Sequence, residues 1–235
     1  MVPPRPPFEV PRYDPARFLQ GLVATVWRQA EDRGKSVHIQ GPWPTIAIYP
    51  TSFTAVVDGG HDGLRVHAGR EDLPLEASVV FTRAPQYNVN HPDMVPLDIL
   101  LWKLALGASR GRLPVDTSLD TPCALGEWPN FTRLIVTPGA MSIAALWARQ
   151  ACTLSQTIRL LELPPADVFA FYSAAAAIDL VRPELPSQPA PATPPAASPA
   201  ASAHTSPPSS SPLPAIAPAP RRSLLRKVFD KLRTT

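Results

Sequence analysis

The sequence predicts an α+β protein. We expect an N-terminal helix packed on a mainly antiparallel sheet of four or five strands, then a small helical domain and a disordered tail that ends in an amphipathic helix. Three observations support this fold class: apolar residues recur at helical spacing near the N-terminus and again after residue 140, short β-rich runs fill residues 37–82, and 13 of the 32 prolines fall within residues 182–220.

These patterns divide the 235 residues into six segments. They are a disordered arm (1–11), an α+β domain (12–108), a connector (109–121), a helical domain (122–181), a disordered Pro/Ala/Ser linker (182–220) and a basic amphipathic helix (221–235).

The first helix should begin after Asp14, an N-cap residue that is followed by Pro15 at the first helical position. Gly34 should end it. The apolar residues between them recur every three or four positions and predict one buried face: Phe18, Leu19, Leu22, Val23, Val26 and Trp27.

Five short runs have the composition of strands: 37–39, 45–49, 53–57, 64–68 and 78–82. Three glycines lie between the third and fourth runs, in Asp58–Gly63, which predicts a hairpin with His61 at an exposed tip. A loop (84–96) should follow the last strand, and an apolar stripe then predicts a helix over 97–108.

Three further helices are expected at 142–151, 153–163 and 166–180, with Trp128 and Phe131 packed beneath them. The order of their apolar positions resembles the three-helix core of winged-helix and helix-turn-helix domains: Leu154, Ile158, Leu161, Leu163, Val168, Phe171, Ala175, Ile178, Leu180 and Val181. That resemblance implies a tri-helical fold and, in the family, DNA reading by the last helix.

The sequence departs from that family in its surface chemistry. The last helix should present Asp167, Phe169, Ala170, Ser173 and Ala174 to solvent, without the Arg, Lys, Asn or Gln that read bases. Residues 141–181 carry two Arg against three acidic residues, and no wing strands are expected after 181. DNA binding by a transcriptional regulator is therefore the alternative, and packing or protein contact is preferred for this degenerate winged-helix-like unit.

The positive charge is concentrated at the C-terminus. Residues 221–235 hold six Lys or Arg and one Asp, whereas the whole chain has a net charge of +3. As a helix this segment has an apolar arc of about 140° opposite basic residues, which favours docking on a partner protein or on an anionic membrane surface. A solvated terminus is the remaining interpretation. The candidate partner- or membrane-binding residues are Leu224, Leu225, Arg226, Lys227, Val228, Phe229, Lys231 and Leu232.

No residues qualify for a catalytic, cofactor or metal role. Cys123 and Cys152 form neither a disulfide framework nor a metal-ligand spacing. His61-Asp62 could form an acid/base pair, but His61 is expected at an exposed, mobile hairpin tip. His91-Pro92-Asp93 matches the tripeptide of J-domain co-chaperones, but residues 84–90 cannot form the basic helix that precedes it in that family, so a loop turn is expected.

The sequence therefore predicts a non-enzymatic adaptor or regulatory protein that acts through protein–protein interaction. Neither a signal peptide nor an apolar run of membrane-spanning length is evident, which favours a cytoplasmic or peripherally membrane-associated protein. High Ala, Pro and Arg usage is typical of a bacterial, GC-rich genome. Nucleic acid is not an expected partner, and the sequence does not indicate an oligomeric state.

Overall fold

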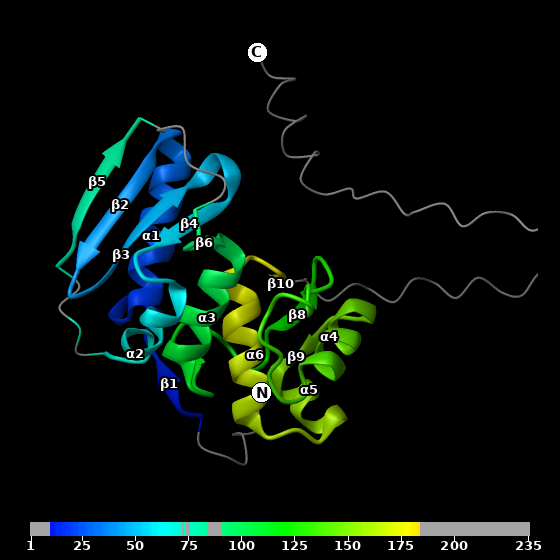
Figure 1. Cartoon of the computed structure of the whole chain (residues 1–235). Coiled ribbons are helices and arrows are strands. Elements are labelled where there is room, and N and C mark those ends of the chain that lie inside the picture. The colour runs from blue at the N-terminus through cyan, green and yellow to red at the C-terminus, as the bar shows by residue number, and fades with distance from the viewer. Residues whose placement is uncertain (1–9, 72, 74–75, 84–90, 184–235) are drawn as a thin grey trace, which may run out of the picture. The chain divides into compact units, whose positions relative to one another are not determined.

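The computed structural model describes residues 10–71, 73, 76–83 and 91–183, all of which belong to one compact unit (Figure 1). The α-helices among them are α1 (Leu19–Arg33), α2 (Arg65–Ala68), α3 (Leu97–Ser109), α4 (Ala140–Arg149), α5 (Leu154–Leu161) and α6 (Pro165–Ala177). One-turn 3-10 helices occur at η1 (Pro15–Arg17), η2 (Pro50–Ser52) and η3 (His61–Leu64). The predictions for residues 1–9 and 184–235, including the C-terminal helix, lie outside the described residues.

The strands form three sheets. The largest has the order β5 (Ser78–Thr82), β2 (Ser36–Gly41), β3 (Trp43–Tyr49), β4 (Thr54–Val57) and β6 (Met94–Pro96), and every neighbouring pair is antiparallel. A second sheet has the order β10 (Val181–Pro183), β8 (Pro122–Leu125), β9 (Cys152–Thr153), and β1 (Arg12–Tyr13) pairs with β7 (Leu113–Pro114). The α+β class and the five-stranded antiparallel sheet are confirmed.

Side chains that alternate along the strands identify the face of the large sheet that is covered by helices. Val37 and Ile39 on β2, and Ile46 and Ile48 on β3, are fully buried and belong to one apolar core with residues of α1 and α3. Figure 1 shows α1 running along one face of the sheet. The helix α1 ends at Gly34 as predicted, in a left-handed conformation with φ 59° that glycine adopts without strain. The expected start is wrong, because Asp14 caps η1 and α1 begins only at Leu19.

The predicted hairpin around Asp58–Gly63 and the predicted strand at 64–68 are wrong. Gly59 and Gly60 have positive φ and turn the chain out of the sheet into η3 and α2. Leu64 and Ala68, four residues apart, are buried, whereas Val66 between them is 71% exposed. That is helical spacing, and a strand would have placed all three side chains on one face. The fifth strand of the sheet is instead β6, which lies in the predicted loop.

The three predicted C-terminal helices are present as α4, α5 and α6. Thr153 caps α5 in a reciprocal capping box: its hydroxyl accepts from Gln156 N at 3.0 Å, and the Gln156 side chain accepts from Thr153 N at 2.9 Å. One short strand, β10, follows α6 and pairs with β8. Its partner β8 precedes α4, and β9 lies between α4 and α5, so this small sheet joins the two ends of the helical segment to its middle.

The solvent-facing surface expected for α6 is also wrong. Phe169, Ser173 and Ala174 are at most 2% exposed. The reason is that α6 packs against α3 on one side and against α4 and α5 on the other. The apolar residues on α6 surround the helix, and a helix that is apolar on all sides is buried.

The helix α3 joins the two halves of the unit. Leu97, Leu100 and Leu104 belong to the core under the large sheet, whereas Trp102 and Ala105 belong to the core formed with α4, α5 and α6. The Trp102 indole packs edge-on against Phe171 of α6 at 5.9 Å between ring centroids, and Trp147 of α4 contacts the same ring at 5.5 Å.

We expect Phe171→Ala to lower the free energy of unfolding by about 3–5 kcal/mol, because Phe171 is fully buried between two tryptophans and the vacated space cannot be refilled easily. Denaturant unfolding followed by tryptophan fluorescence measures the change. Leu160→Ala, at a side chain that is 61% exposed, is the control and should change stability by less than about 0.5 kcal/mol. Equal effects of the two substitutions would contradict the packing described above.

Candidate functional site

The candidate site residues from the sequence, Leu224 to Phe229 together with Lys231 and Leu232, all lie outside the described residues, and their role stays a prediction. Within the described part of the chain, two other features stand out. One is a pocket beside α3, and the other is a surface of exposed apolar side chains.

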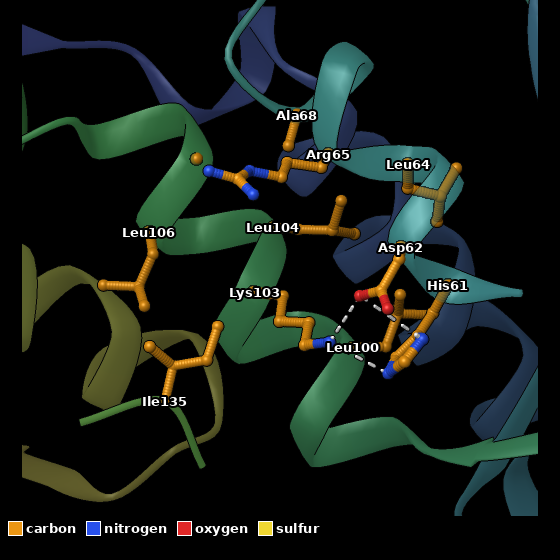
Figure 2. Close-up of a pocket in the computed structure, with 11 residues that line it drawn as sticks. His61, Asp62, Leu64, Arg65, Ala68, Leu100, Lys103, Leu104, Leu106 and Ile135 are labelled. Atoms are coloured by element: carbon orange, nitrogen blue, oxygen red, sulfur yellow. Dashed lines mark hydrogen bonds and ion pairs between the residues drawn. The ribbon is translucent and has the colours of Figure 1, made fainter. Parts of the chain in front are cut away.

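A pocket of about 420 Å³ opens where η3 and α2 pack against α3; we call it the Lys103 pocket (Figure 2). Its polar side chains come from both sides: His61, Asp62 and Arg65 from η3 and α2, and Lys103 from α3. The other lining residues are Gly107, which has no side chain, and six residues with apolar side chains. These apolar side chains are Leu64, Ala68, Leu100, Leu104, Leu106 and Ile135.

The ammonium group of Lys103 connects the polar side chains. It donates to Asp62 Oδ1 at 2.8 Å and to His61 Nε2 at 3.0 Å (Figure 2). Because an ammonium group can only donate, Nε2 is the acceptor and the proton of neutral His61 sits on Nδ1. That nitrogen is 3.8 Å from Asp62 Oδ1. The three side chains therefore form a closed polar cluster at the edge of an apolar pocket.

The cluster sets the charge of its members. Burial lowers the pKa of His61, and the neighbouring Lys103 ammonium lowers this pKa further against the opposing effect of Asp62. The hydrogen bond from Lys103, together with its charge, lowers the pKa of Asp62. At neutral pH the cluster therefore holds a cationic lysine, an ionised aspartate and a neutral histidine.

The chemistry available in the Lys103 pocket is binding or proton transfer. None of its described lining residues carries a hydroxyl or a thiol, so covalent catalysis has no nucleophile of that kind here.

The expectation that His61 is an exposed hairpin tip is wrong, because its side chain is only 27% exposed and faces Lys103. The sequence did carry a signal that we missed: Lys103 is the one charged residue between Asp98 and Arg110 on an otherwise apolar helix.

A larger hollow of about 790 Å³ lies between η1, α1 and α6 but is more open to solvent. Its tyrosines serve packing: Tyr13 donates from its hydroxyl to Gln20 Oε1 at 3.2 Å, and Tyr172 accepts from Thr117 at 3.5 Å. Burial raises the pKa of both tyrosines, so neither is ionised near neutral pH.

The two cysteines are buried and lie opposite each other in the β8–β9 pair, with Cys123 in register with Cys152. Burial raises the pKa of Cys123 to about 11, and the adjacent Cys152 adds to this effect. Since the thiolate is the reactive form of cysteine, Cys123 is a packed, unreactive thiol at neutral pH.

Exposed apolar side chains are concentrated in the segment that runs from the loop after β8 into the start of α4. Four large apolar side chains of residues 128–141 are about half exposed: Trp128 51%, Ile135 48%, Val136 53% and Met141 51%. We call them the 128–141 surface. The expectation that Trp128 packs beneath the helices is wrong; only its neighbour Phe131, in edge contact with it, packs against the core.

A hydrogen bond from α3 holds the 128–141 segment against the core. Trp102 of α3 donates from its indole N–H to Ile135 O at 3.0 Å. Ile135 also lines the Lys103 pocket, so the pocket and the 128–141 surface adjoin at this residue.

Groups of three or more His, Cys, Asp or Glu that could hold a metal ion do not occur among the described residues. No helix in the described part of the chain has the length and apolar character needed to cross a membrane. Comparisons with protein-family models, with curated proteins and with solved structures found no match to this chain.

The lowered pKa of His61 makes stability depend on pH. Because the unfolded chain takes up this proton first, near pH 6.5, folding loses free energy as the pH falls below that value. We expect His61→Gln, which keeps an acceptor for Lys103, to reduce the fall in melting temperature between pH 7 and pH 5. Thermal unfolding of both proteins across this range measures it, and parallel curves would contradict the assigned environment of His61.

Proposed function

We propose that this protein is a non-enzymatic adaptor or regulatory protein that binds another protein through the 128–141 surface. In this proposal a tethered basic helix at residues 221–235 docks on the partner or on an anionic membrane surface. The observation that carries the proposal is the concentration of exposed apolar side chains in one short segment.

Exposed apolar side chains are common singly but are notable when they gather. Nine large apolar side chains stand out as exposed in the described chain, and four of them fall within residues 128–141. Trp and Met are enriched in protein interfaces, and Trp is a frequent contributor to binding energy. The hydrogen bond from Trp102 to Ile135 O holds this segment on the core, which supports a preformed binding surface.

The C-terminal helix is proposed from its sequence pattern. Residues 182–220 would act as a tether that raises the local concentration of the helix near a partner already bound to the body. The leucines and Phe229 would supply apolar contact, and the basic residues would contact acidic protein surface or anionic lipid, about 1 kcal/mol for each basic residue near such lipid.

The competing function is a DNA-binding regulator. DNA readers of the helix-turn-helix class place their last helix in the major groove. Here Phe169 and Ser173 of the corresponding helix α6 are buried, and this burial favours the adaptor. A gel-shift titration at about 50 mM salt separates the two functions, since sequence-dependent binding by the full chain would support the regulator.

We expect the double variant Val136→Glu, Met141→Glu to lose its partner in a crosslinking pulldown, because two carboxylates would have to be desolvated at the contact. Val115→Glu, at a valine that is 44% exposed outside the 128–141 surface, is the matched control and should retain the partner. Melting temperatures should be nearly unchanged in both variants. Retention of every crosslinked protein by the double variant would refute the proposed surface.

For the tail, we expect Leu225→Glu with Phe229→Glu to abolish binding to phosphatidylserine vesicles or to the crosslinked partner, because the apolar arc is interrupted. Vesicle sedimentation and pulldown with the full chain separate the two targets. Thr234→Glu is the control for added charge. The proposal for the tail fails if both kinds of binding survive the double substitution, and the melting temperature of the body should not change in either case.

A further inference from the structure

The Lys103 pocket has the size and the lining of a small-molecule site. Its volume of about 420 Å³ lies in the lower part of the range of about 300–1,000 Å³ that is usual for ligand pockets. Leu64, Leu100 and Leu104 form walls that are only 1% exposed, and the polar cluster lies at one edge. A matching ligand therefore has a compact apolar body and one polar head.

The charges of the lining select the sign of that head. Lys103 and Arg65 are cationic, Asp62 is anionic, and neutral His61 adds no charge, so the lining carries a net positive charge. In the view of Figure 2, Leu104 lies between the two cationic side chains.

Exposure shows which partner of Lys103 can be replaced. The side chain of Lys103 is 26% exposed, whereas that of Asp62 is 85% exposed. Asp62 can return to water at little cost because it is already hydrated, and an exposed ion pair of this kind contributes little to stability. Lys103 is less hydrated, because its neighbours Trp102 and Leu104 are buried, and without Asp62 it would keep only the hydrogen bond to His61 Nε2.

We propose that the Lys103 pocket binds a small amphiphilic carboxylate. Its apolar part lies against Leu64, Leu100 and Leu104, and its carboxylate accepts a hydrogen bond from Lys103 in the place of Asp62. The proposal does not depend on the protein partner. Because Ile135 belongs to both features, the bound ligand would lie next to the 128–141 surface.

Calorimetric titration of the full chain with butanoate, hexanoate and octanoate tests the apolar part. The dissociation constant should tighten about fourfold for each added methylene while the pocket has room. Lys103→Met should weaken octanoate binding at least about tenfold, because a charged hydrogen-bond partner is lost. Lys103→Arg should largely retain binding, and Lys35→Met, at an exposed lysine outside the pocket, should retain it fully.

Asp62→Asn should change octanoate affinity in the opposite direction to Lys103→Met. Removing the internal competitor should tighten octanoate binding, by up to about fivefold, and should weaken the binding of octylammonium. Because Asp62 is exposed, this variant should fold normally, and a melting curve checks that every variant is folded. The variant Val136→Glu, Met141→Glu should still bind octanoate, so this proposal and the proposed partner surface can fail separately.

Three results would overturn the assigned role of Lys103, and with it the proposal. Octan-1-ol could bind as tightly as octanoate, folded Lys103→Met could bind octanoate unchanged, or Asp62→Asn could weaken it. Each would show that Lys103 does not receive the carboxylate. Absence of octanoate and hexanoate binding to the wild-type chain at millimolar concentration would overturn it as well.

Discussion

The burial of α3 on both of its faces is the constraint on which the rest of the structure depends. Leu97, Leu100 and Leu104 face the core beneath the five-stranded sheet, and Trp102 and Ala105 face α6 and its neighbours. A helix that is apolar on all sides needs cover on all sides. The sheet with α1 covers one apolar face of α3, and α6 with α4 and α5 covers the other.

This constraint changes what the helix-turn-helix resemblance implies. The order of α4, α5 and α6 and the capped turn into α5 agree with the predicted tri-helical core. However, α6 packs against α3, α4 and α5, and Phe169 and Ala174, which were expected at the solvent-facing surface, are fully buried. The three helices therefore occur in the predicted order, but the residues expected at the DNA-reading surface are buried.

Local periodicity predicted most of the elements, and long-range packing decided the rest. The residues of β2 and β3 alternate, and those of α1 recur at helical spacing, so their states could be predicted from sequence. Leu64, Val66 and Ala68 fit alternation equally well, but in the structure this segment packs against α3 as a helix with Leu64 and Ala68 buried. The polar cluster was not predictable, because Lys103 and Asp62 are 41 residues apart in sequence.

The position of Lys103 argues for a role in binding. An ammonium group beside an apolar pocket is costly unless it is paired, and a leucine at this position would avoid that cost. The pairing depends on the turn at Gly59 and Gly60, which leads into η3 and brings Asp62 over α3. Yet the Asp62 side chain is 85% exposed, and pairs of this kind add little to stability. The arrangement therefore stabilises the fold weakly, while it holds a cation at the edge of an apolar pocket, where an anionic ligand can reach it.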